Sequence, residues 1–147
     1  MKPVGMLWVL GHRVRPLDTD PAYAMVEVTS PPRVPGPPPH YHHDQKEFFF
    51  VVRGTLDVMI NGDWRKCPAG TFVELTPNTS HTFINNSDED AVWVTGWRPK
   101  GFEKFFLDFG VPVEETDAAE KSVSPELIQR VVAGVERYGM ILSKERP

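Results

Sequence analysis

The apolar residues between Met1 and Trp97 come in short runs of strand length, and this spacing constrains the fold more than any other feature. The runs are rich in β-branched and aromatic residues, and Gly, Pro, Asn and Asp separate them. No helical pattern interrupts them, although parallel strands would need such a connection. The chain is therefore expected to be all-β, an antiparallel sandwich or a small barrel. The predicted strands are Val4–Leu10, Ala24–Thr29, Glu47–Arg53, Thr55–Ile60, Trp64–Lys66, Thr71–Leu75, Thr79–Asn85 and Ala91–Trp97.

Two features mark where these strands turn or stop. Ile60-Asn61-Gly62-Asp63 predicts a tight hairpin, because Asn and Gly both tolerate positive φ. Six prolines fall between Pro31 and Pro39, and proline cannot donate to a strand ladder. We expect that segment to be a stiff extended approach to the residues that follow it.

Two amphipathic helices are predicted after the strands. The first rests on phenylalanines at helical spacing, Phe102, Phe105, Phe106 and Phe109. The second begins at Ser124-Pro125, an N-cap followed by proline at the first helical position, and ends near Gly139. Both apolar stripes are expected to pack on the outside of the barrel. Residues 1–99 would then form the barrel and residues 100–147 a helical extension of the same domain. The apolar positions of the second helix are Leu127, Ile128, Val131, Val132, Val135 and Tyr138.

Composition excludes several classes of partner. A net charge of −4 and a pI of about 5.7 disfavour binding to nucleic-acid phosphates. No apolar run approaches the roughly 18 residues of a membrane span, so we expect a cytoplasmic protein without a membrane partner. The single cysteine, Cys67, cannot close an intrachain disulfide and is expected to be at least half-buried. An apolar first strand, Met6–Leu10, needs its edge covered, which predicts a homodimer.

Histidines carry the chemistry of this sequence. His40 and His42 are two residues apart, so on a strand they point to the same face. Glu47 opens the next apolar strand, and His81 starts or lies within a later one. The four side chains can converge inside a small barrel. Three imidazoles and one carboxylate suit one divalent metal per chain, such as Fe, Mn, Ni or Zn.

The other two histidines are expected to lie elsewhere. His43 has the opposite strand parity to His42, so its side chain should point away from the metal. His12 is expected at the surface or at an interface.

Strand parity also predicts the wall of a cavity around the metal. Phe49 and Val51 share the face of Glu47, while Phe83 and Asn85 share the face of His81. On the last strand, either Val92 and Val94 or Trp93, Thr95 and Trp97 face inward, and parity alone leaves both open. A largely aromatic cavity favours a planar organic ligand over a sugar or phosphate, which would call for clusters of Arg, Lys or Asn.

The spacing of these residues resembles the two motifs of the cupin superfamily. His40-x-His42-x4-Glu47-x6-Gly54 is similar to the first motif, and Gly70-x5-Thr76-x-Asn78-x2-His81-x3-Asn85 to the second. Fifteen residues, Thr55–Ala69, separate them, a typical intermotif length. The second motif departs from the usual pattern at Asn78, which replaces a glycine, but Asn also tolerates positive φ. The resemblance implies a jelly-roll barrel of about six to eight strands with a metal inside.

Further segments resemble the bacterial quercetin-dioxygenase-like cupins, and together they cover most of residues 5–110. They are Gly11-His12-Arg13, Pro37-Pro38-Pro39-His40 and Gly101-Phe102-Glu103-Lys104-Phe105-Phe106. This resemblance implies a metal-dependent dioxygenase acting on a small enol, phenol or flavonoid-like molecule. Glu47 would then be both a metal ligand and the catalytic proton acceptor. A cupin isomerase or lyase, or a non-catalytic cupin that binds a metal or small molecule, remains open, because this fold hosts many functions.

Overall fold

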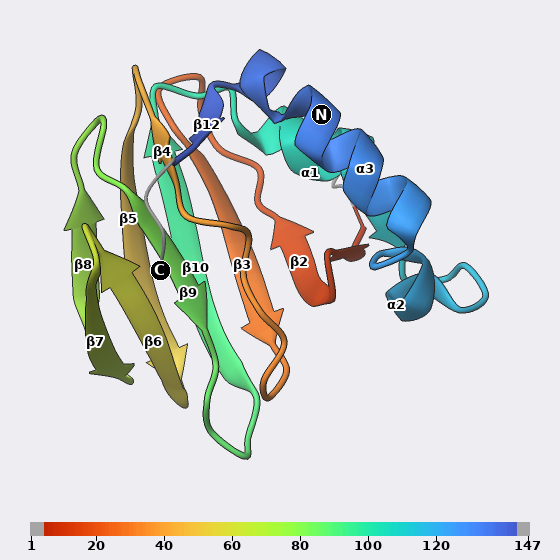
Figure 1. The fold of residues 1–147 in the computed structure, drawn as a ribbon, viewed down its shortest axis with the longest axis horizontal. Coiled ribbons are helices and arrows are strands. Elements are labelled where there is room, and N and C mark those ends of the chain that lie inside the picture. The colour runs from red at the N-terminus through yellow and green to blue at the C-terminus, as the bar shows by residue number, and fades with distance from the viewer. Residues whose placement is uncertain (1–4, 144–147) are drawn as a thin grey trace.

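The computed structural model describes residues 5–143 and consists mainly of two antiparallel sheets that lie face to face (Figure 1). The order of the seven-stranded sheet is β11 (Val111–Pro112), β1 (Leu7–Val9), β2 (His12–Pro16), β3 (Ala24–Ser30), β10 (Ala91–Arg98), β5 (Lys46–Arg53) and β8 (Phe72–Leu75). The order of the five-stranded sheet is β12 (Met140–Leu142), β4 (His40–His42), β9 (His81–Ile84), β6 (Thr55–Ile60) and β7 (Asp63–Pro68). This architecture confirms the prediction of an all-β jelly roll with C-terminal helices.

The described residues form more strands than the resemblance implies, because several strands are very short. β1, β4 and β12 have three residues each, and β11 has two. The predicted strands omit β2, β4, β11 and β12. β4, β11 and β12 have only two or three residues, too few to show a periodicity. β2 has five residues, but Val14 is its only β-branched residue. The segment Val4–Leu10 was predicted as one strand, of which Val4 lies outside the described residues. Instead β1 ends at Val9, and Leu10 and Gly11 adopt positive φ in a tight turn into β2.

The predicted hairpin is confirmed. Asn61 and Gly62 have φ of 49° and 90°, and Ile60 pairs with Asp63 across the turn. Two consecutive residues with positive φ match the right-handed twist of the flanking strands, so β6 and β7 pair along their whole length.

The apolar strand β1 is not the free edge that the homodimer prediction assumed. β11 pairs with one side of it and β2 with the other, so the chain covers this strand itself. The homodimer stays a prediction, but an uncovered β1 edge no longer supports it.

Cys67 is buried, as predicted, and burial raises the pKa of its thiol. Within residues 5–143, none of the helices has the length and apolar character needed to cross a membrane.

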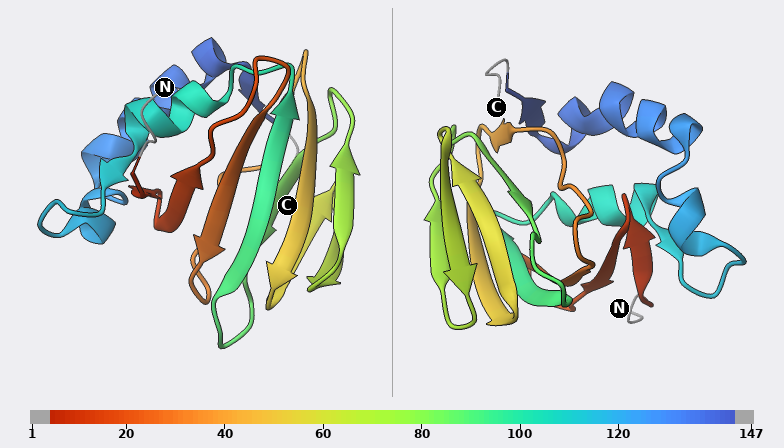
Figure 2. Two further views of the ribbon diagram at one scale, coloured as in Figure 1. Left: turned by 180° about the vertical axis from the view of Figure 1, so that it is seen from behind. Right: turned by 60° about the horizontal axis from the view of Figure 1, so that its bottom comes forward.

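The helical segments gather along one side of the sheets (Figure 2). They are α1 (Glu103–Phe109), α2 (Ala118–Lys121), α3 (Pro125–Gly134) and the 3-10 helix η1 (Val135–Tyr138). The N-cap prediction is confirmed, since the Ser124 side chain accepts a 3.3 Å hydrogen bond from the Leu127 backbone N–H. Buried residues of α1, α3 and η1 join those of the strands in one hydrophobic core.

The apolar stripe of α3 is narrower than predicted. Leu127, Val131 and Val135 are buried, whereas Ile128 and Val132 are 42% and 52% exposed. Residues at i, i+4 and i+8 lie along one line of the helix, and their successors are rotated by about 100°. The helix therefore contacts the core mainly along that line, with Gly134 buried beside it against Phe109.

Candidate metal centre

Four buried side chains from three strands converge between the two sheets. His40 and His42 lie on β4, Glu47 on β5 and His81 on β9. His40 and His81 are direct partners in the β4–β9 ladder. One potential ligand atom from each of the four residues lies within 4.8 Å of those of the others. The residues singled out from the two sequence motifs thus meet in one place.

The local backbone explains why only two of the three adjacent histidines join this cluster. β4 buries His40 and His42 on the same face, with Tyr41 between them on the other. His43 lies just beyond the strand and is exposed, and its Nδ1 lies 2.8 Å from Oδ1 of Asn78. Asn78 has the positive φ of 67° that its place in the motif predicts.

Backbone carbonyls orient two of the imidazoles. Nδ1 of His40 lies 3.0 Å from the Pro38 carbonyl oxygen, and Nδ1 of His81 lies 2.9 Å from that of Thr79. A carbonyl oxygen can only accept, so each Nδ1 carries the hydrogen and donates it. This turns Nε2 of each ring toward the cluster, which is how metal-binding histidines are usually held. In His81 that nitrogen donates to Glu47, so a cation would have to displace its hydrogen.

Electrostatics keep Glu47 ionised. Its Oε1 lies 2.9 Å from Nε2 of His81 and 3.3 Å from Nε2 of His42. Burial raises the pKa of Glu47, but the charge of His81 and the hydrogen bonds from both histidines outweigh burial and hold the pKa well below its usual range. In turn, burial lowers the pKa of His81, but the Glu47 carboxylate outweighs that effect and raises it. Burial, followed by the charge of His81, lowers the pKa of His40 to about 3.

The cluster fits a divalent cation. It offers three imidazole nitrogens and a carboxylate, the ligand set that suits metals such as zinc, iron, manganese and nickel. Glu47 is anionic and His40 neutral, which are the ligand protonation states that metal binding requires. The raised pKa of His81 favours its protonated form, so metal binding would release a proton from His81. Nδ1 of His42, the ring nitrogen that does not face Glu47, is buried and has no hydrogen-bond partner among the described residues.

A cavity of about 80 Å³ adjoins the cluster, and its wall corresponds in part to the predicted one. Phe49 and Phe83 line it, whereas Val51 and Asn85 do not. Strand parity left open which face of β10 points into the cavity, and the structure shows that Val92 and Val94 point away from it. The residues of β10 that line the cavity are Trp93, Thr95 and Trp97.

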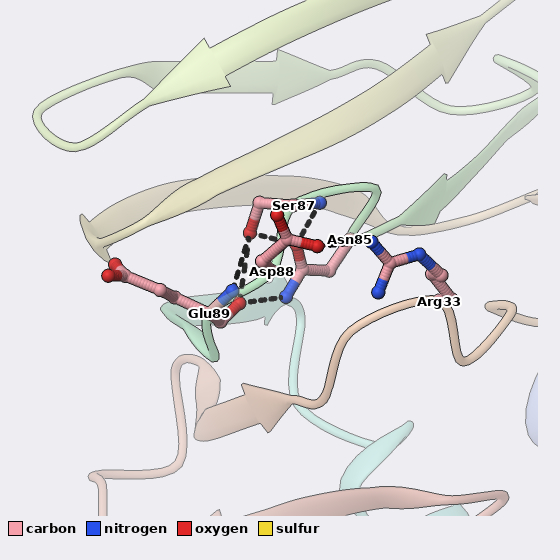
Figure 3. A network of polar contacts seen from close by, with 5 residues as sticks. All are labelled: Arg33, Asn85, Ser87, Asp88 and Glu89. Carbon is pink, nitrogen blue, oxygen red and sulfur yellow. Dashed lines mark hydrogen bonds and ion pairs between the residues drawn. The ribbon is translucent and has the colours of Figure 1, made fainter.

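Asn85 lies in a polar network at the end of the barrel instead (Figure 3). Its side-chain amide donates to the carbonyl oxygens of Ser30 and Glu89 at 2.9 and 2.7 Å, and its Oδ1 accepts from the Ser87 backbone N–H at 2.9 Å. Arg33 pairs with Asp88 beside it. Asn85 is therefore fully bonded to backbone and holds the β9–β10 loop against the end of β3.

Helix α1 contributes to the cavity, which sequence patterning did not predict. Phe102, Phe105 and Phe106 line the cavity as well as belonging to the core. The Phe102 ring centre lies 4.7 Å from that of His42 and 4.9 Å from that of Trp97. The expectation that these phenylalanines pack on the outside of the barrel is therefore wrong. Helical spacing shows that they share one face of a helix, but not which part of the protein that face contacts.

The prediction for His12 is also wrong, because its side chain is buried beside the cavity. Its Nε2 lies 2.9 Å from the Pro35 carbonyl oxygen, so Nε2 carries the hydrogen. Nδ1 then accepts from the Ser30 hydroxyl at 2.9 Å, and Ser30 Oγ accepts from the Trp93 indole N–H at 3.0 Å. Both ring nitrogens of His12 are thus paired, which explains how a histidine can be buried here.

The two sheets form a jelly-roll barrel, and the buried cluster of three histidines and one glutamate inside it is a site that could hold a metal ion. The family model described as "Cupin domain" matches residues 26–97, which contain all four residues of the cluster. Over residues 26–97 the chain belongs to the cupin superfamily. None of the curated proteins matches it.

Solved structures share the fold at low sequence identity. KdgF from Halomonas sp. is 21% identical, with a TM-score of 0.57, and the match covers 61% of this chain and 80% of that one. A Cupin 2 conserved barrel domain protein from Salinispora arenicola is 21% identical, with a TM-score of 0.57 and coverage of 74% and 95%. A cupin-superfamily sugar phosphate isomerase from Silicibacter pomeroyi is 20% identical, with a TM-score of 0.57 and coverage of 62% and 61%. At these identities the likeness shows the fold alone.

Proposed function

We propose that this cupin is a metal-dependent enzyme of the dioxygenase type whose substrate is a small planar enol or phenol. The observation that carries the proposal is the position of the buried cluster at the wall of an otherwise apolar, aromatic-rich cavity. Aromatic walls accept a flat organic molecule, and the few polar groups that adjoin the cluster fix its orientation.

The lining argues against the substrate named for one structural neighbour. A sugar phosphate is normally held by Arg, Lys or several N–H donors. The residues that line the cavity include no Arg and no Lys. Similarity to a sugar phosphate isomerase is therefore evidence for the barrel but does not extend to its substrate.

The volume of the cavity favours the smallest members of the proposed class. Pockets for drug-sized molecules measure about 300–1,000 Å³, and an engineered cavity of about 150 Å³ holds benzene. The present cavity measures about 80 Å³. A short-chain enol fits this space better than a flavonoid, which would require helix α1 to move away from the cavity.

The chain's own residues divide the chemical roles. When bound by His40, His42, Glu47 and His81, a divalent metal would supply Lewis acidity that favours the deprotonated oxygen of the substrate. Glu47 is the only carboxylate among the lining residues and is ionised, so it is the group placed to accept that proton. The rings of Phe102 and Phe106 exclude water from the same space.

The test is oxygen uptake by protein loaded separately with Fe, Mn, Ni or Zn. The panel contains a short-chain 1,3-dicarbonyl, a catechol, a flavonol and a sugar phosphate. We expect stoichiometric loss of O2 and of the dicarbonyl or catechol with a redox-active metal, and no reaction of the sugar phosphate. Absence of O2 uptake with every metal and every compound would contradict the proposal.

A non-catalytic binding protein is the second candidate, and one observation favours it. Both oxygens of Glu47 are already bonded, Oε1 to His81 and Oε2 to Thr95, which suits a fixed ligand better than a mobile base. In that case calorimetry would show binding of the metal or of the small molecule without any loss of substrate.

A further inference from the structure

One buried polar group beside the cluster has no partner within the described chain. The indole N–H of Trp97 makes no hydrogen bond, although the residue is only 2% exposed. An indole nitrogen can donate but cannot accept, so only an acceptor atom can satisfy it. Buried donors without an acceptor are rare because desolvating them costs free energy.

Trp97 lies where a ligand of the cluster would contact it. It is the register partner of Glu47 across β10 and β5, and its ring centre is 6.5 Å from that of His42. It also lines the cavity, where the Phe106 ring packs 5.6 Å away. The Phe102 and Phe106 rings that pack on it supply no acceptor, and both oxygens of Glu47 are already bonded, to His81 and Thr95. Nδ1 of His42 is the other unpaired buried side-chain atom of the described residues, and it makes no hydrogen bond with the indole N–H.

Trp93 provides an internal comparison. It lies on the same strand and lines the same cavity, but its indole N–H donates to Ser30 Oγ at 3.0 Å. The fold thus satisfies one of the two cavity tryptophans from within and leaves the other without an acceptor.

We propose that the Trp97 indole N–H donates a hydrogen bond to an oxygen of the bound ligand. The ligand then has two oxygens, one at the cluster and one at Trp97, so the favoured class is enediolates, hydroxyketones and dicarbonyl enolates rather than simple phenols. This inference rests on the ligand site of the proposed function and narrows its substrate class. It does not depend on whether turnover occurs.

The test uses Zn-loaded, 15N-labelled full-length protein, because Zn is diamagnetic and redox-inert. The probe is acetohydroxamate, a planar two-oxygen mimic of an enediolate. The chain has four tryptophans, and single Trp→Phe variants assign their indole signals. We expect the Trp97 N–H proton to move downfield on titration, as for a newly formed hydrogen bond. The Trp93 proton, already bonded, should move much less.

Binding by matched variants gives a second measurement. Trp97→Phe should weaken acetohydroxamate binding about tenfold or more but leave phenol binding unchanged. Trp64→Phe, at an exposed position on β7 outside the cavity, should leave acetohydroxamate binding unchanged. Trp93→Phe should lower thermal stability, because it breaks a hydrogen bond within the protein. An unmoved Trp97 signal in saturated wild-type protein, or equal binding by Trp97→Phe, would overturn this inference alone. Lack of binding to the wild type would overturn the ligand site itself and the inference with it.

Discussion

The Thr95 hydroxyl on β10 donates a 2.8 Å hydrogen bond to Oε2 of Glu47 on the neighbouring strand β5. Both groups are buried, and the bond occupies the carboxylate oxygen that does not contact the histidines. The orientation of Glu47 is therefore set jointly by β10 and by His81. Contacts of this kind around metal ligands are energetically important, because they hold the ligand in place before the metal binds.

Replacing this hydroxyl should weaken the metal site without dismantling it. Thr95→Val keeps the shape of the side chain but removes the donor to Glu47. We expect the metal Kd to rise by roughly 10-fold to 100-fold, the usual effect of losing such a contact. Competition titration with a chromophoric chelator measures the change. Thr29→Val on β3, outside the cluster and the cavity lining, is the matched control, and an equal Kd for both variants would contradict the role of Thr95.

Metal content should follow the four clustered residues. We expect one divalent metal per wild-type chain and almost none in the double variant His42→Ala plus His81→Ala, because only His40 and Glu47 would remain. Elemental analysis of purified protein gives the stoichiometry. His43→Ala, which removes an adjacent but exposed histidine, should keep full occupancy. Full occupancy in the double variant would show that the metal lies elsewhere.

Glu47→Gln separates the two roles proposed for this residue. The substitution keeps one ligand oxygen but removes the charge, so metal should bind more weakly while the three histidines retain part of it. At full metal occupancy, turnover should still fall by roughly 10²-fold to 10⁴-fold, as expected for loss of a general base. Rate measurements on protein titrated to saturation test this. A wild-type rate at saturation would leave Glu47 as a ligand only, and Glu74→Gln on the exposed face of β8 is the control.

Burial of His12 should make stability depend on pH. Burial lowers the pKa of His12, so the folded protein holds it neutral while the unfolded chain protonates it near the ordinary histidine pKa of 6.5. Its contribution is therefore fully present above about pH 6.5 and is lost as the pH falls below that value. The free energy of unfolding, from denaturant titrations of metal-free protein, should decrease between pH 6.5 and 5. Over that range His81, whose pKa is raised, is protonated in both the folded and the unfolded chain and adds little slope.

His12→Gln tests the assignment. The variant should be less stable at pH 7.5 by about 1–3 kcal/mol, because Ser30 or Pro35 loses its buried partner. Its stability should also decline less steeply with acid, with the remaining decline due partly to His40, whose pKa is lowered as well. A decline as steep as that of the wild type would assign the pH dependence to other groups.

Local sequence rules determined much of this protein. The spacing of His40 and His42 puts both on one face of a strand, and Asn61-Gly62 and Ser124-Pro125 specify a turn and a helix start. These features depend on backbone geometry within a few residues, which spacing and residue type report directly. The two motifs also identified the four residues of the metal cluster. The distances between these four side chains depend on how their strands pair, which the motifs do not specify.

Only the tertiary structure decided what each face meets. Both faces of β10 carry apolar residues, and its pairing with β3 and β5 places Trp93, Thr95 and Trp97 rather than Val92 and Val94 at the cavity. The same reason accounts for the remaining differences between sequence and structure. Periodicity states which side chains share a face, but the surface opposite that face comes from distant parts of the chain. Burial of His12, bonding of Asn85 to backbone and packing of α1 against the cavity are all set by such distant contacts.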